Sequence, residues 1–492
     1  MDVHHRYPGD HDRPRALNHL ANVLWTRFEQ LGQMADLEQV IIYERAALEL
    51  RPPGHPDRSD SLNNLAVSLL TRFEQLGQMA DLEQGIIYQR DTLELRPPGH
   101  HNRSGSLSNL ANSLLILFEQ LGEMADLEQA IIYQRAALEL RPPGHPSRSG
   151  SLSKLANLFS TRFKQLGQMA DLEQVIIYQR AALELHPPGH PDHSMSLRNL
   201  AKSLSTRFEQ LGQMADLEQA IIYQRDALEL RPPGHPDRAV FLSDRAGSLL
   251  TRFRQLGRMA DLEQAIIYYR DTLELCPPGH HDRPSSLNNL ATSLALNHLA
   301  NVLWTRFEQL GQMADLEQVI IYERAALELR PPGHPDRSDS LNNLAVSLLT
   351  RFEQLGQMAD LEQGIIYQRD TLELRPPGHH NRSGSLSNLA NSLLILFEQL
   401  GEMADLEQAI IYQRAALELR PPGHPSRSGS LSKLANLFST RFKQLGQMAD
   451  LEQVIIYQRA ALELHPPGHP DHSMSLRNLA KSLSTRFEQL GQ

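Results

Sequence analysis

Residues 103–147 read Arg-Ser-Gly-Ser-Leu-Ser-Asn-Leu-Ala-Asn-Ser-Leu-Leu-Ile-Leu-Phe-Glu-Gln-Leu-Gly-Glu-Met-Ala-Asp-Leu-Glu-Gln-Ala-Ile-Ile-Tyr-Gln-Arg-Ala-Ala-Leu-Glu-Leu-Arg-Pro-Pro-Gly-His-Pro-Ser. Most of the 492-residue chain consists of variants of this unit, because a Pro-Pro-Gly-His segment recurs with its glycine at positions 54, 99, 144, 189, 234, 279, 333, 378, 423 and 468. The spacing is 45 residues except for one step of 54. Such a period indicates stacked supersecondary units that bury their apolar faces against one another.

Each unit contains two stretches with the apolar spacing of an α-helix. In the first, helix A, apolar residues at offsets 0, 3, 4, 7, 11 and 14 from Leu107 line one helical face. The second, helix B, carries its apolar stripe on Leu127, Ala130, Ile131 and Leu138. Because no strand pattern occurs, we expect an all-α fold, a right-handed αα-solenoid of 45-residue helix A and helix B repeats.

The expected helix ends carry recognisable signals. Gly122 ends helix A, and Asp126, followed three residues later by glutamine, has the pattern of an N-cap with a capping box for helix B. Arg141 suits the negative end of the helix B dipole, and the two prolines after it cannot continue the helix. We expect Ser149 or Ser151 to cap the next helix A.

The composition favours a folded protein that binds neither nucleic acid nor membranes. The chain is 40% hydrophobic and 22% charged, with a net charge of −10. Lysines and arginines are spread over the repeats, so no basic patch is expected to attract phosphate. No apolar run approaches the roughly 18 residues of a membrane span, and the N-terminus lacks a signal-peptide core. We expect a cytoplasmic protein, and we interpret the lone Cys276 as a surface substitution.

The chain also repeats itself on a larger scale. Residues 295–492 are identical to residues 16–213, so that the start of helix A occurs twice, nine residues apart. This indicates a recent tandem duplication or an error in assembling the gene. Nine residues at about 3.6 per turn rotate the apolar stripe by about 180°. We therefore expect one long helix over approximately 284–310, with opposed apolar faces in its two halves and with the repeats on either side out of register.

The repeats divide the chain into four parts. We expect a partial repeat tail over 1–12, a first array over 13–282, an elongated helix over 283–310 and a second array over 311–492. The sequence begins with the end of a helix B and stops after a helix A, whereas solenoids normally carry polar capping repeats. We interpret the chain as part of a longer architecture.

The pattern of small and large residues resembles the tetratricopeptide (TPR) repeat. The resemblance rests on Leu110 and Ala111 in helix A, and on Ala130, Ala137 and Pro142. Ser-Leu-x-Asn-Leu-Ala and Tyr-Gln-Arg-Ala-Ala-Leu-Glu-Leu are similar to the kinesin-light-chain type of repeat. Leu-Arg-Pro-Pro-Gly-His-Pro-Asp-Arg is similar to long fungal TPR proteins that often carry a CHAT domain. The resemblance implies a non-catalytic scaffold for protein–protein interaction.

Two features depart from the TPR pattern. Helix A is about one turn longer between Ala111 and Gly122, and the aromatic residue of helix B lies one position early, at Tyr133. No CHAT domain or P-loop follows the repeats in this sequence. We expect no enzyme activity and no cofactor. The alternative is that the repeats are the sensor of a multidomain signalling enzyme, of CHAT or NTPase type, whose catalytic domain is missing.

Few patterns suggest catalysis or metal binding. Asp126 and Glu128 lie at a helix start, which explains them as cap and dipole residues. Successive helical layers lie about 8–10 Å apart, whereas ligands lie about 2.1 Å from one zinc ion. We therefore expect no metal site and interpret the loop histidines as polar loop residues: His55, His100, His101, His145, His190, His235, His280 and His281.

Solvent-side positions of helix A vary between repeats, whereas Arg-Phe-x-Gln-Leu-Gly-x-Met-Ala-Asp-Leu-Glu-Gln barely changes. In TPR families helix A lines a concave groove, where asparagines bind an extended peptide. The groove residues that the resemblance implies are Asn63, Asn64, Ser108, Asn109, Asn112, Lys154, Asn157, Arg198, Asn199 and Lys202. The alternative is that these positions are exposed and free to vary.

The expected partner is a peptide or a partner domain. Lys154, Arg198, Asn199 and Lys202 form the most basic stretch of the predicted groove. Since lysine and arginine pair with carboxylates, we expect this stretch to bind an acidic segment or a C-terminal carboxylate.

Overall fold

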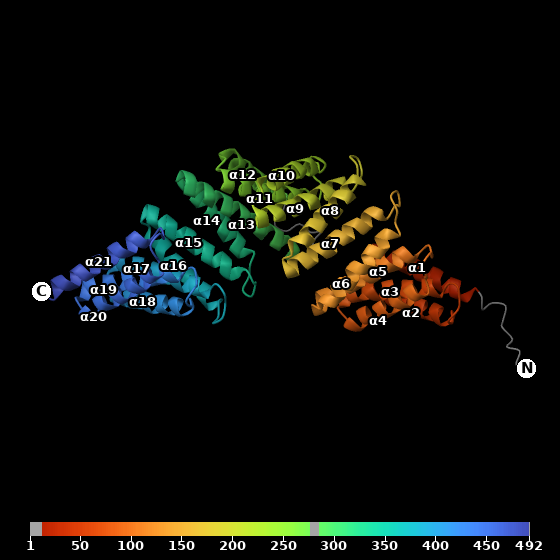
Figure 1. Ribbon diagram of the computed structural model, residues 1–492, viewed down its shortest axis with the longest axis horizontal. Helices are drawn as coiled ribbons and strands as arrows, with labels where there is room; N and C mark the ends of the chain where they lie inside the picture. The colour runs from red at the N-terminus through yellow and green to blue at the C-terminus, as the bar shows by residue number, and fades with distance from the viewer. Residues whose placement is uncertain (1–11, 276–284, 492) are drawn as a thin grey trace, which may run out of the picture. The chain divides into compact units, whose positions relative to one another are not determined.

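The computed structural model describes residues 12–275 and 285–491. The chain divides into two compact units, Met1–His235 and Pro236–Gln492. The described residues form 21 helices and no strand, and each helix A from α1 to α19 packs against the helix B that follows it (Figure 1). The expected all-α fold of paired 45-residue repeats, a TPR-like solenoid, is confirmed. The handedness and the four-part division remain predictions.

In the first unit, every helix A has 19 residues and every helix B has 16. The helix A segments are α1 (Arg13–Leu31), α3 (Arg58–Leu76), α5 (Arg103–Leu121), α7 (Arg148–Leu166) and α9 (His193–Leu211). The helix B segments are α2 (Met34–Glu49), α4 (Met79–Glu94), α6 (Met124–Glu139), α8 (Met169–Glu184) and α10 (Met214–Glu229).

The second unit follows the same plan. Its helix A segments are α11 (Arg238–Leu256), α13 (Ser285–Leu310), α15 (Arg337–Leu355), α17 (Arg382–Leu400), α19 (Arg427–Leu445) and α21 (His472–Gln489). Its helix B segments are α12 (Met259–Glu274), α14 (Met313–Glu328), α16 (Met358–Glu373), α18 (Met403–Glu418) and α20 (Met448–Glu463).

The helix ends confirm one expected signal and correct others. Gly122 ends α5 with a φ of +76°, a left-handed conformation that favours glycine, and its N–H donates to the Phe118 carbonyl at 2.7 Å. The expected N-cap at Asp126 is wrong, because α6 already begins at Met124 and Asp126 lies in its first turn. Acidic charge in the first turn still suits the helix dipole. The caps expected at Ser149 and Ser151 are also wrong, because both residues lie inside α7.

The core of each repeat forms where helix A meets helix B. Leu110 and Leu127 are fully buried, and the alanines of the TPR pattern, Ala130 and Ala137, are 0% exposed, which lets neighbouring helices approach closely. One apolar cluster continues from α3 to α8. Each repeat therefore contributes to a core that it shares with its neighbours. Along the described residues, no helix combines the length and apolar character needed to cross a membrane.

The helix expected at the junction of the duplicated segments is present as α13. It has 26 residues, seven more than the helix A segments of the first unit. The expectation that the two halves of α13 have opposed apolar faces concerns side chains that lie partly outside the described residues. Cys276, which was expected to be a surface residue, also lies outside them.

The expected loss of register around α13 is wrong. Arg306 Nη1 lies 3.0 Å from Glu263 Oε2 of α12, the same contact that Arg72 Nη1 makes with Glu38 Oε2 at 2.9 Å. The first pair is 43 residues apart in sequence and the second 34, a difference of nine. The part of α13 that contains Arg306 therefore packs against α12 in the same register as the other repeats.

Candidate functional site

The helices that carry the predicted groove are joined by ion pairs between repeats. Arg162 of α7 donates from Nη2 to Asp171 of α8 at 2.6 Å and from Nη1 to Glu128 of α6 at 2.9 Å. The hydrogen bond to Asp171 is the main cause that raises the pKa of Arg162. The Asp171 side chain is only 2% exposed. This contact holds α7 to the helices before and after it.

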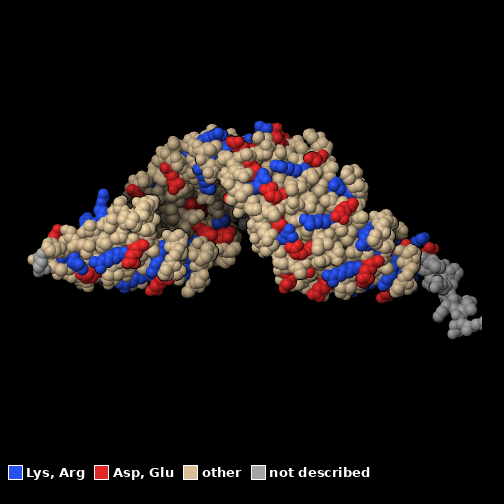
Figure 2. All heavy atoms as spheres, viewed as in Figure 1, with Lys and Arg blue, Asp and Glu red and all other residues tan. Residues whose placement is uncertain are grey.

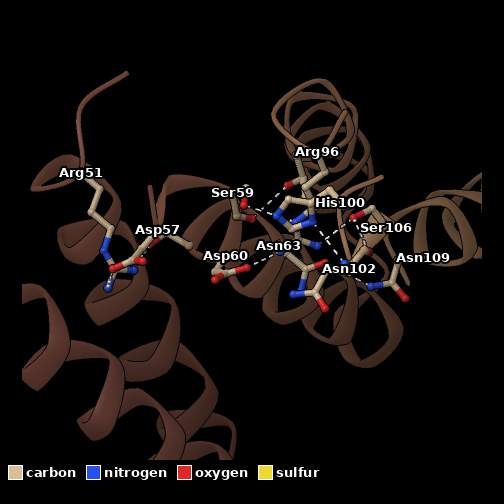
Figure 3. A network of polar contacts seen from close by, with 12 residues as sticks. Arg51, Asp57, Ser59, Asp60, Asn63, Arg96, His100, Asn102, Ser106 and Asn109 are labelled. Carbon is tan, nitrogen blue, oxygen red and sulfur yellow. Dashed lines mark hydrogen bonds and ion pairs between the residues drawn. The ribbon is translucent and has the colours of Figure 1, made fainter. Parts of the chain in front are cut away.

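A second polar network joins the Leu-Arg-Pro-Pro loops to helix A (Figure 3). Arg96 donates to Ser106 Oγ at 2.8 Å and to Ser59 Oγ at 3.3 Å, and it pairs with Asp60. Arg96 is 4% exposed. Arginine at this position therefore does more than complement a helix dipole, because it connects helix A segments of two successive repeats.

All ten predicted groove residues lie on helix A segments. Asn63 and Asn64 lie on α3, with Ser108, Asn109 and Asn112 on α5, Lys154 and Asn157 on α7, and Arg198, Asn199 and Lys202 on α9. Asn112, Lys154, Asn157, Asn199 and Lys202 are exposed, whereas Asn63, Asn64, Asn109 and Arg198 are half-buried.

Two neighbouring hollows bring five of these residues together in the first unit. One, of about 200 Å³, is lined by Asn112, Lys154 and Asn157 together with Gln134 of α6. The other, of about 300 Å³, is lined by Asn157, Asn199 and Lys202. Asn157 contributes to both hollows, so they adjoin along α5, α7 and α9, and their walls also contain apolar residues such as Leu115 and Phe163. We call the surface of these two hollows the helix A groove.

The other predicted residues lie beside the hollows rather than in their walls. Asn109 Nδ2 donates to Asn63 Oδ1 at 3.2 Å, between α5 and α3 (Figure 3). Lys154 Nζ donates to Ser108 Oγ at 3.2 Å, between α7 and α5. Ser108 is 3% exposed, so it lies beneath the surface and positions Lys154.

Several residues that line the larger hollow were not predicted from the sequence. They are Gln179 of α8, Lys164 of α7, and the hydroxyl residues Ser153, Ser160, Ser196, Ser203 and Thr206. Gln179 lies seven residues after Leu172, on the helix B stripe that is otherwise apolar. A polar residue in that stripe is the signal that identifies it. Gln179 Oε1 is buried and accepts no hydrogen bond from the described residues.

The charge of the groove is basic but local. Desolvation by the neighbouring helices lowers the pKa of Lys154, and the nearby charge of Arg141 lowers it further. Elsewhere acidic and basic side chains alternate on the visible surface, without a large field of one sign (Figure 2). Lys164 and Lys202 add positive charge to the larger hollow.

Solved structures with a similar arrangement of helices have low sequence identity to the chain. Human IFIT1, as a dimer with PPP-AAAA, is 13% identical and has a TM-score of 0.42; the match covers 98% of this chain and 96% of that chain. The C-terminal part of a TPR repeat-containing protein from Cytophaga hutchinsonii is 13% identical, with a TM-score of 0.43 and coverage of 67% and 99%. TPR-like repeats of a putative kinesin light chain from Podosopora anserina are 16% identical, with a TM-score of 0.33 and coverage of 44% and 96%.

No protein-family model matches the chain, and no curated protein matches its sequence.

Proposed function

We propose that the helix A groove binds an extended peptide or a peptide-like segment of a partner domain. The observation that supports this most is the pair of adjoining hollows, which share Asn157 and are lined by amide and lysine side chains. A groove built from amides suits a peptide backbone, because each asparagine offers two N–H donors and one carbonyl acceptor.

The chemistry of the groove favours an acidic ligand. Lys154, Lys164 and Lys202 offer charged donors for carboxylates, which form the stronger class of hydrogen bond. Gln179 Oε1 offers a buried acceptor that a peptide N–H can satisfy, and satisfying it removes a desolvation cost of about 1–3 kcal/mol. The ligand is therefore a segment with carboxylates at its side chains or its C-terminus.

The identical second copy has the same groove within the second unit. Asn436, Asn478, Lys481, Lys443 and Gln458 line a hollow of about 310 Å³ between α19, α20 and α21. Each chain thus presents two copies of the proposed binding surface, and variants must be introduced in both.

Binding is tested by fluorescence anisotropy against a library of acidic and neutral peptides. Replacing Lys154, Arg198, Asn199 and Lys202 by alanine, together with Lys433, Arg477, Asn478 and Lys481 of the second copy, is expected to abolish peptide binding. The matched control removes exposed positive charge from helix B through Arg180→Ala and Arg459→Ala. Peptides that bind the eight-residue variant as tightly as the original chain would contradict the proposal.

Nucleic acid is the alternative ligand that the same experiment tests. The sequence argues against it through the net charge of −10, but one of the solved structures with 13% identity to the chain is the human IFIT1 dimer with PPP-AAAA. A short 5′-triphosphate RNA is therefore included as a probe. Competition between this RNA and an acidic peptide for the groove, with tighter binding of the RNA, would replace the peptide proposal.

A sensor role in a larger signalling enzyme remains the alternative at the level of the whole protein. It places the same groove in the regulatory part of a longer chain. Sequencing of the transcript beyond residue 492 distinguishes the two, because an in-frame CHAT or NTPase segment supports the sensor and an immediate stop codon supports the free-standing scaffold.

A further inference from the structure

The loop between α8 and α9 differs from the corresponding loops in one residue with chemical consequences. Its sequence is Leu-His-Pro-Pro-Gly-His-Pro-Asp-His over 185–193, with His186 where the loops at 51, 96, 141 and 231 have arginine. The same nine residues recur over 464–472. The substitution places an imidazole beside a second histidine and a carboxylate.

Three possible metal ligands converge in this loop. Among the described residues, only His186, His190 and Asp192, and their copies His465, His469 and Asp471, form groups in which the ligand atoms of three His, Cys, Asp or Glu side chains all lie within 4.8 Å of one another. His186 Nε2 is 4.0 Å from Asp192 Oδ2, and His190 Nδ1 is 3.9 Å from the same oxygen.

These separations are close to those of a formed site. Two ligands about 2.1 Å from a tetrahedral ion are about 3.4 Å apart. A contraction of about half an ångström brings the atoms to this spacing. The His190 ring stacks on the His186 ring with centroids 4.3 Å apart, so it must also turn for both nitrogens to face one ion. The side chains of His190 and Asp192 are 38% and 67% exposed, which leaves room for this movement. Coordination by His190 Nδ1 replaces the hydrogen bond that this atom accepts from the Asp192 amide at 3.1 Å.

The buried histidine is oriented like a metal ligand. Ser196 Oγ lies 2.8 Å from His186 Nδ1. When Nδ1–H donates to this hydroxyl, Nε2 is left unprotonated and faces Asp192, and metal-bound histidines commonly have such a second partner.

The corresponding arginine loops show why they lack such a site. In the loop before α3, Arg51 Nη2 lies 3.8 Å from Asp57 Oδ2, so a permanent positive charge occupies the space beside the carboxylate. In the loop before α7, Ser147 replaces the aspartate. Histidines of successive repeats are too far apart to share one ion, whereas His186 and His190 lie within one loop.

We propose that His186, His190 and Asp192 bind one divalent transition metal ion, and that His465, His469 and Asp471 bind a second. Two imidazoles and one carboxylate suit Zn²⁺ and similar ions better than Ca²⁺ or Mg²⁺, which prefer oxygen ligands. The remaining coordination positions are left to water or to a ligand atom of a partner. This inference is independent of the proposed peptide groove.

The test is titration of the full chain, free of affinity tags and of metal, with Zn²⁺ at pH 7.5 followed by isothermal calorimetry. We expect saturation at two ions per chain. His186→Arg with His465→Arg introduces the residue found in the other loops and is expected to abolish both sites, with circular dichroism showing an unchanged fold. An original chain that binds no Zn²⁺, or a double variant that still binds two ions, would overturn the proposal.

Two further variants separate this site from ordinary surface histidines. His145→Gln with His424→Gln removes loop histidines that have no neighbouring carboxylate, and we expect two ions to bind as before. Asp192→Ser with Asp471→Ser copies Ser147 and is expected to weaken binding at least about tenfold. Visible absorption bands of bound Co²⁺ provide a second readout, and their retention in the serine variant would contradict the assigned ligands.

Discussion

Arg162 Nη2 lies 2.6 Å from Asp171 Oδ1, nine residues further along the chain, and the same guanidinium reaches Glu128 one repeat earlier. Arg207 makes the same two contacts with Asp216 and Glu173. In α5, Leu117 takes the place of this arginine, and the corresponding Asp126 is half-buried rather than buried. The ion pair therefore recurs between repeats, and the repeat that contains α5 folds without it.

We predict that Arg162→Leu, with Arg441→Leu in the second copy, lowers the free energy of unfolding by about 3 kcal/mol at each site, because a buried carboxylate loses its partner. Adding Asp171→Asn and Asp450→Asn removes the unpaired charges and should restore part of the loss. Urea denaturation followed by circular dichroism measures both effects. A loss well under 1 kcal/mol per site for the arginine variant would show that Asp171 is solvated.

A second prediction concerns Glu44 in α2 and its copy Glu323. Burial raises the pKa of each carboxyl from 4.5 to about 7, and both remain hydrogen-bonded to a serine. In the unfolded chain the group ionises near pH 4.5, whereas in the folded chain it holds its proton up to about pH 7. Stability is therefore lost as the pH rises from 4.5 to 7 and stays lower above that range, by about 3 kcal/mol per site.

Other repeats have glutamine at this position, including Gln89 and Gln134, so Glu44→Gln with Glu323→Gln should fold normally. We expect the variant to be more stable than the original chain at pH 8, with the difference reduced at pH 5. Melting temperatures at the two pH values provide the measurement. If the melting temperatures of the variant and the original chain differed equally at both pH values, ionisation of Glu44 and Glu323 would not be the cause of the difference.

Replacing Gly85, inside α4, by alanine is predicted to stabilise the folded protein. An added Cβ would lie 3.2 Å from Leu70 Cγ. The next repeat has alanine at this position, Ala130, opposite Leu115, and there Ala130 is 0% exposed. Gly85→Ala should therefore raise the free energy of unfolding by about 0.5–1 kcal/mol through helix propensity. Urea denaturation checks this, and a destabilised variant would show that Leu70 cannot adjust as Leu115 does.

Gly167, which ends α7, should respond in the opposite way. Its φ is +64° and nothing lies within 4 Å of an added Cβ, so Gly167→Ala meets only the backbone cost of a left-handed conformation, about 1 kcal/mol of destabilisation. Gly150 in the same helix also has open space but no positive φ. Gly150→Ala is the matched control and should not destabilise, so equal losses in the two variants would contradict the explanation.

The sequence predicted the fold well because period, apolar spacing and the glycine at the end of helix A all indicate the same paired helices. It misplaced the start of helix B, because the helix already begins two residues before this aspartate, at Met124 in α6 and Met169 in α8. The carboxylate of Asp171 forms an ion pair with helix A, whereas Asp126 has Leu117 in place of that arginine. For the groove, exposed positions such as Asn157 and Asn199 could be predicted from variation between repeats. Ser108 could not be separated from them, since only the packing of α7 on α5 shows that it is buried.

The unchanged contact between Arg306 and Glu263 has a consequence for how genes of repeat proteins gain segments by duplication. The helix at the duplication boundary, α13, has 26 residues instead of 19, and Arg306 near its end still meets Glu263 of α12. Recombination inside the early turns of helix A therefore yields a chain that still stacks, even when the inserted segment is not a multiple of 45 residues. The contact of Arg306 with Glu263 lies after the added turns, so the register of docking is set there and not by the total length of the helix.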